Sequence, residues 1–272
     1  MNLLYSTLKQ LEFKVFLYTI FYILLFNSIQ YAVLHFFSTL FDAKYLYLGN
    51  LVGLTIALAF IILIYKRFNR SIEKYDTIYY KRVIIIILCL LIFKILIDPI
   101  LNVFTIIDGD TLTSVDKSDI PIKYKLSYIL SFSILTPIIE ELFFRGILLE
   151  KLLSSKKKTV VVVIYSSFLF ALIHVNPLDI SSISIETLTV AFVLGMITAF
   201  IYVSTRNIYY CIVFHILNNI FSFLIFHVYN FEYVAIINYL SFDYRYWLII
   251  TLSCFLFLLL IKKFKLVGNG TD

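Results

Sequence analysis

The stretch Thr136-Pro-Ile-Ile-Glu-Glu-Leu-Phe-Phe-Arg145 is the most informative part of the sequence, because it places two adjacent carboxylates inside an apolar run long enough to cross a membrane. A charged side chain near the centre of a bilayer costs at least about 2.5–3.5 kcal/mol. Such side chains usually face the interior of a helix bundle or a wet cavity, and the default hypothesis for them is a functional site. We therefore expect Glu140 and Glu141 to lie inside a membrane helix bundle.

Composition supports a membrane protein. The chain is 61% hydrophobic and 15% charged, whereas soluble domains have about 45–50% apolar and about 25% charged residues. Repeated apolar runs approach the roughly 20 residues that a membrane helix needs. We predict an all-α fold, a polytopic membrane helix bundle of about eight transmembrane helices. The expected spans are about 15–41, 46–65, 83–107, 124–150, 158–175, 186–204, 208–228 and 245–261.

The basic residues predict the orientation. Loop 66–82 is the most basic, and lysine and arginine concentrate in cytoplasmic loops. Alternating outward from that loop places most of the 23 lysines and arginines, and both termini, in the cytoplasm. Because these residues are dispersed over loops that flank helices, we expect contact with the lipid bilayer and no nucleic-acid partner. The predicted location is the cell membrane.

Two pairs of polar side chains within the spans share a four-residue spacing, which places both members on one helix face. Glu141 and Arg145 form one pair, and His215 and Asn219 form the other. Glu140 points about 100° away from Glu141 and needs a different partner. One alternative is a buried polar network that only locks helices together. The other is a water-activating site, because a carboxylate, imidazoles and an amide supply a base and hydrogen-bond donors.

The remaining polar residues at membrane depth have simpler interpretations. Lys94 and Asp98 are spaced by four and are expected to neutralise each other. The isolated cysteines form no disulfide or metal pattern, and we expect them to be small core residues; they are Cys89, Cys211 and Cys254.

Three motifs resemble one known family. Glu140-Glu141-Leu-Phe-Phe-Arg145 matches EExxxR, Phe170-Ala-Leu-Ile-His174 matches FxxxH, and His215-Ile-Leu-Asn-Asn219 matches HxxxN. In this order they are similar to the signature of the CPBP family of intramembrane proteases, which includes CAAX prenyl endopeptidases and bacteriocin-immunity proteins. The resemblance predicts CPBP-like catalytic core helices at 124–228. It leaves 1–123 as transmembrane helices without a recognised motif and 229–272 as the last helix and a basic tail, all within one integral membrane domain.

The resemblance implies a mechanism and the residues that perform it. Glu140 would act as general base on a water molecule that His174 helps to hold, while His215 and Asn219 would stabilise the oxyanion. Glu141 and Arg145 would orient Glu140. We favour no metal, because the two-histidine HExxH helix of common zinc proteases is absent. If zinc binds, its ligands would be Glu140, His174 and His215.

The predicted function is an intramembrane endopeptidase that cleaves a membrane-associated protein or peptide, in bacteriocin immunity or in peptide-signal or CAAX-type processing. Richness in Ile, Lys, Tyr and Phe favours a bacterial source. The alternatives are a non-catalytic membrane interaction or immunity protein and a proton-coupled transporter. The depths of two site residues disagree with a shared site: Glu140 lies about 15 Å and His174 about 24 Å from the cytoplasmic ends of their spans. A shared site therefore requires either that the fifth span projects into the cytoplasm or that the boundaries expected there are wrong.

Overall fold

The computed structural model describes residues 2–41, 46–68, 126–127, 129–154, 158–174 and 185–224, and the described regular elements are all helices. These elements fall into two compact units. The first contains α1 (Asn2–Leu40), α2 (Leu46–Phe68), a helix at 129–153 and α7 (Thr159–Leu172). The second contains α8 (Ile185–Thr205) and α9 (Ile208–Leu224).

Three described helices are long and apolar enough to cross a membrane, at Phe16–Leu40, Tyr47–Phe68 and Thr187–Thr205. They coincide with the first, second and sixth predicted spans. The helices α7 and α9 are apolar but shorter. The predicted spans at 83–107 and 245–261, with Lys94, Asp98, Cys89 and Cys254, lie outside the described residues.

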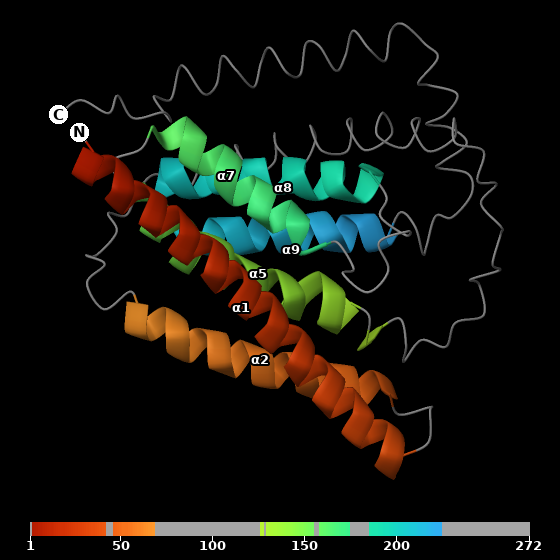
Figure 1. Ribbon diagram of the computed structural model, residues 1–272. Helices are drawn as coiled ribbons and strands as arrows, with labels where there is room; N and C mark the ends of the chain where they lie inside the picture. The colour runs from red at the N-terminus through yellow and green to blue at the C-terminus, as the bar shows by residue number, and fades with distance from the viewer. Residues whose placement is uncertain are drawn as a thin grey trace, which may run out of the picture. The chain divides into compact units, whose positions relative to one another are not determined.

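α1 and α2 form a hairpin in which small residues allow close packing. A side chain at Gly49 would meet the ring of Phe37 at 2.9 Å, and one at Gly53 would meet the amide oxygen of Gln30 at 2.8 Å. Ala57 is buried one turn further along α2. Such a stripe of small residues is typical of closely packed membrane helices. In Figure 1, α1 (red) lies across α2 (orange) within the first unit.

The helix at 129–153 carries the glutamate pair and changes its winding on both sides of it. The π-helical segment η3 (Ile129–Leu135) precedes α5 (Thr136–Phe143), and a second one, η4 (Phe144–Leu149), joins α5 to α6 (Glu150–Leu153). Pro137 lies in the first turn of α5. Proline removes one backbone donor and crowds the carbonyl four residues earlier, and π turns are among the adjustments that accommodate it in membrane helices.

This helix is the core of the first unit. Every side chain from 139 to 149 is buried. It contacts α2 on one side and α7 on another, and Figure 1 shows it as α5 beside both α1 and α2. The segment 139–149 is therefore enclosed on all sides, whereas most apolar side chains in the described part of α1, residues 16–40, are exposed. The two carboxylates therefore lie in a fully buried segment of the helix.

In the second unit, α8 and α9 pack against each other and are joined by a tight turn. Arg206 has a positive φ of 51°, which ends α8, and its backbone N–H donates to the carbonyl of Tyr202. The side-chain oxygen of Asn207 accepts the backbone N–H of Tyr209 at 2.9 Å and so caps the start of α9.

Candidate active site

The two glutamates of α5 differ in their surroundings. The Glu140 residue is 8% exposed to solvent, whereas Glu141 is completely buried. They lie between two π-helical segments, and such segments are frequent at functional sites because they displace side chains from regular helical positions.

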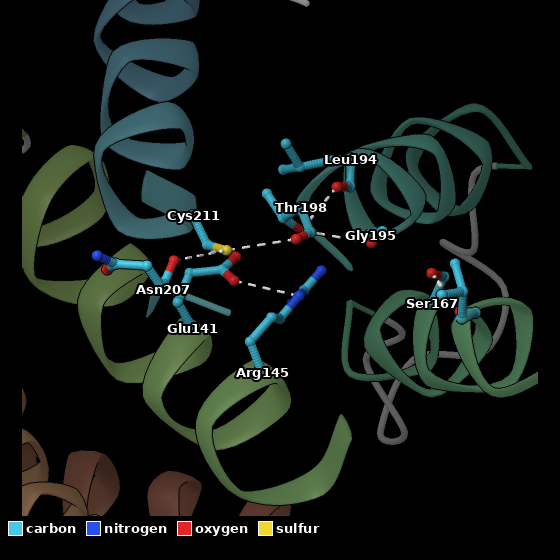
Figure 2. Close-up of polar contacts among 9 residues, drawn as sticks. Glu141, Arg145, Ser167, Leu194, Gly195, Thr198, Asn207 and Cys211 are labelled. Carbon is cyan, nitrogen blue, oxygen red and sulfur yellow. Dashed lines mark hydrogen bonds and ion pairs between the residues drawn. The ribbon is translucent and has the colours of Figure 1, made fainter. Parts of the chain in front are cut away.

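Glu141 has the partner that its spacing predicts. Nε of Arg145 lies 3.1 Å from Oε2 of Glu141, and neither side chain is exposed (Figure 2). The guanidinium carbon is also 4.6 Å from the ring centre of Phe170 and 5.9 Å from that of Phe144. A buried cation is therefore held between a carboxylate and two aromatic faces, which keeps one charge of the glutamate pair compensated.

Phe170 connects the first two motifs. Besides facing Arg145, its ring meets Phe144 edge to face at 5.1 Å and lies 5.0 Å from the ring of His174. The helix at 129–153 extends three residues beyond the predicted boundary at 150, so Arg145 lies about 12 Å from its end. Phe170 lies about 16 Å from the start of α7. Measured from the same ends, Glu140 lies at about 20 Å and His174 at about 23 Å, so the mismatch of about 9 Å between them falls to about 3 Å.

His174 follows the end of α7 and is exposed. Its Nδ1 atom is 3.0 Å from the carbonyl oxygen of Phe170. Because a carbonyl oxygen only accepts, Nδ1 carries the proton, and in the neutral ring Nε2 then presents its lone pair. That nitrogen is suited to accept a proton from water or to bind a metal.

The third motif lies on α9. His215 is 2% exposed, and Asn219 is half-buried. The amide nitrogen of Asn218 donates to Oδ1 of Asn219 at 3.0 Å. This bond assigns the acceptor end of the Asn219 amide, so the opposite end of Asn219 is the donor. The motifs did not identify this contact of Asn218, although two adjacent asparagines in an apolar helix are a signal for it.

The helix that faces α9 within the second unit is lined by small buried residues. Ala191, Gly195 and Ala199 recur every four positions on α8 and are buried. Thr198 donates to the carbonyl of Leu194 at 2.9 Å, and the thiol of Cys211 lies 3.4 Å from the carbonyl oxygen of Thr198 (Figure 2). Cys211 is completely buried and not in a disulfide, in agreement with its predicted place in the core.

Tyr22 on α1 is a further residue at the candidate site. Its ring stacks on that of Phe143 at 4.1 Å and meets Phe144 edge to face at 5.9 Å. Only 8% of it is exposed, and the carboxylate of Glu140 acts electrostatically on its phenol group. No spacing within α1 points to this role, because the contact arises only when α1 packs against α5.

The predicted site residues divide between the units. Glu140, Glu141, Arg145 and His174 belong to the first, with Phe170 joining the last two. His215 and Asn219 belong to the second, and their convergence with Glu140 stays a prediction from the motifs. Within the described ranges, no three His, Cys, Asp or Glu side chains form a group that could hold a metal ion.

Comparison with known proteins identifies one family. Residues 122–221 match the model of the family described as type II CAAX prenyl endopeptidase Rce1-like. All three motifs fall inside the matched segment, whereas α1 and α2 lie outside it. No curated protein and no solved structure matches the chain. The match confirms the predicted resemblance: residues 122–221 are similar to this family of CAAX-type proteases.

Proposed function

We propose that this integral membrane protein, with its CAAX-type protease region at 122–221, is an intramembrane endopeptidase that uses Glu140 to activate water. The family implies a protease and hence a hydrolase, and its members act on membrane-associated proteins. One observation supports the catalytic assignment above all. Arg145 compensates Glu141 directly at 3.1 Å, while Glu140 retains some exposure beside Tyr22.

In the proposed reaction, Glu140 removes a proton from water as the oxygen attacks the carbonyl carbon of the scissile peptide bond. The carbonyl oxygen becomes an oxyanion, and His215 and the donor end of the Asn219 amide hydrogen-bond to it. Such donors contribute typically about 2.7–4 kcal/mol each. Collapse of the intermediate breaks the C–N bond, and Glu140 returns its proton to the leaving amine. The base thus regains its starting state without an external proton donor.

The other residues position these groups. Arg145 holds Glu141, which fixes the α5 turn that carries Glu140. The Asn218 bond fixes the Asn219 amide, and Phe170 places His174 relative to η4. His174, with Nδ1 directed at a carbonyl, presents Nε2 to hold the attacking water. Tyr22 is proposed to orient the Glu140 carboxylate.

The metal-free mechanism remains our preferred version, with zinc on Glu140, His174 and His215 as the alternative. Carboxylate and imidazole donors suit zinc chemically, and zinc would supply a polarised water. Metal analysis of purified protein separates the two versions. About one zinc per chain, lost in a His215→Gln variant together with activity, would establish the metalloprotease.

The test of the proposed function is a Glu140→Gln variant compared with Glu150→Gln, a matched change in partly exposed α6. Membranes from cells that make each variant are analysed for new peptide termini by mass spectrometry. Because a general base contributes about 10²–10⁴-fold, termini that the parent protein produces should be lost with Glu140→Gln and retained with Glu150→Gln. The same termini in both variants, at equal protein levels, would refute the assignment. Bacteriocin immunity and peptide-signal processing are the proposed settings for this activity.

A further inference from the structure

An apolar cavity of about 630 Å³ lies within the first unit, lined by α1, α2 and the α5–η4 segment. Its volume is within the roughly 300–1,000 Å³ of small-molecule sites. Arg67 is the charged side chain among its described lining residues, which are otherwise apolar or tyrosine. Since α1 presents most of its apolar side chains to the surroundings, the cavity lies where lipid chains surround the protein.

The cavity has the length of one leaflet. On α2 its lining extends from Ala57 to Phe68, which is about 16 Å along a helix axis. The hydrocarbon core of a bilayer is about 30 Å thick. A chain that enters beside Arg67 and reaches Ala57 would therefore traverse the depth of a single leaflet.

The Arg67 end of the cavity is basic. Nζ of Lys151 lies 4.4 Å above the ring of Tyr18 and 5.3 Å above that of Phe68, and both rings line the cavity. Lys151 also lies 3.4 Å from the Tyr18 hydroxyl, to which it donates. Two cations from different helices thus flank one end of an otherwise apolar cavity. Basic pockets between membrane helices on the cytoplasmic side recognise anionic lipid head groups.

We propose that this cavity binds an anionic phospholipid of the cytoplasmic leaflet, with an acyl chain along α1 and α2 and its phosphate between Arg67 and Lys151. The opposite wall contains Ile139, which precedes Glu140, Phe143, which lies three positions after Glu140 on the same helix, and Tyr22, which stacks on Phe143. The bound chain therefore lies against the helix that carries the candidate base, and it fills a space between α1 and α5 that protein side chains leave open.

The experiment measures lipid binding to the purified full-length protein by native mass spectrometry. Phosphatidylglycerol and phosphatidylcholine with identical acyl chains are titrated separately. The proposal predicts one tightly bound phosphatidylglycerol and weaker binding of phosphatidylcholine. Arg67→Gln should lower the phosphatidylglycerol affinity about fivefold, which corresponds to about 1 kcal/mol per basic residue. Lys66→Gln removes the same charge one position away, outside the cavity lining, and should change it less than about twofold.

A second matched pair tests the cavity itself. Ile64 lines it, whereas Leu63 is exposed and does not. Ile64→Trp should weaken binding of both lipids, and Leu63→Trp should weaken neither. If Ile64→Trp does not fold, the exposed Arg67 and Lys66 variants decide the question alone.

Several results would overturn the proposal. Equal losses for Arg67→Gln and Lys66→Gln would reveal diffuse attraction to a basic surface. Equal affinities for the two phospholipids would remove the head-group preference. A farnesylated peptide that displaces phosphatidylglycerol, and whose own affinity is insensitive to Arg67→Gln, would assign the cavity to a substrate chain instead.

Discussion

Replacing Arg145 with methionine tests whether the buried ion pair stabilises the helix that carries the candidate base. Arg145 and Glu141 are both completely buried, with 3.1 Å between Nε and Oε2. Removing one partner of such a pair leaves an uncompensated buried charge and costs about 3–5 kcal/mol. Arg145 also faces the Phe170 ring at 4.6 Å, a contact worth up to about 2 kcal/mol when desolvated. We expect Arg145→Met to cost about 5 kcal/mol of unfolding free energy.

The opposite single change should cost less. Glu141→Gln leaves Arg145 between the rings of Phe144 and Phe170, so we expect a loss near the lower limit, about 3 kcal/mol. The double variant contains neither charge, and the second substitution removes no further pair. Because no buried charge is left uncompensated, its loss should be about 2 kcal/mol, from the contact of Arg145 with Phe170, rather than the sum of about 8, which gives a coupling energy of about 6 kcal/mol.

The assay is unfolding in mixed micelles with increasing dodecyl sulfate, followed by the helical circular dichroism signal. Glu150→Gln on the partly exposed α6 is the control and should change the unfolding free energy by less than about 0.5 kcal/mol. A coupling energy below about 0.5 kcal/mol would refute the reasoning, since the two side chains would then act independently. A loss below about 1 kcal/mol for Arg145→Met would refute it as well.

Three further variants test single contacts. Tyr22→Phe keeps the stack on Phe143 and removes the hydroxyl that interacts electrostatically with Glu140, so cleavage should slow about tenfold with unchanged unfolding. An equal effect from the exposed Tyr31→Phe would contradict this. Asn207→Ala should destabilise α9 by about 1 kcal/mol, because it removes the helix cap, whereas Asn207→Asp should retain the cap. Thermal unfolding of both variants measures the difference. Equal losses in both would exclude the cap. Phe170→Ala should cost about 3–5 kcal/mol, because its ring is completely buried, and a chemical unfolding midpoint equal to that of the parent would disprove it.

Local spacing predicted the features that depend on one helix. The Glu141–Arg145 pair follows from the four-residue repeat, and the bounds of α8 and α9 differ from those of the expected spans by no more than a few residues. These bounds follow from the runs of apolar residues and from the polar turn at 206–207, and both signals come from neighbouring residues in the sequence.

Features that depend on several helices were not predicted. The role of Tyr22 requires α1 to pack on α5, and nothing distinguishes it among 21 tyrosines in the sequence. The π-helical segments depend on the hydrogen-bond register around Pro137, which hydropathy does not encode. The orientation of His174 depends on where α7 ends, since its imidazole binds the carbonyl of Phe170 only after the last helical turn.

The contact between Arg145 and Phe170 explains why the first two motifs belong together physically. The guanidinium of Arg145 is paired with a carboxylate on its own helix and with an aromatic ring on another helix. A second charged partner in place of the ring would also have to be desolvated, which costs free energy. Phe170 supplies that ring, and His174 lies four positions later, just after the end of α7. The position of the histidine is therefore linked to the compensation of Glu141. If the two were independent, Phe170→Leu would affect stability alone; because they are linked, it should also impair catalysis by displacing the imidazole.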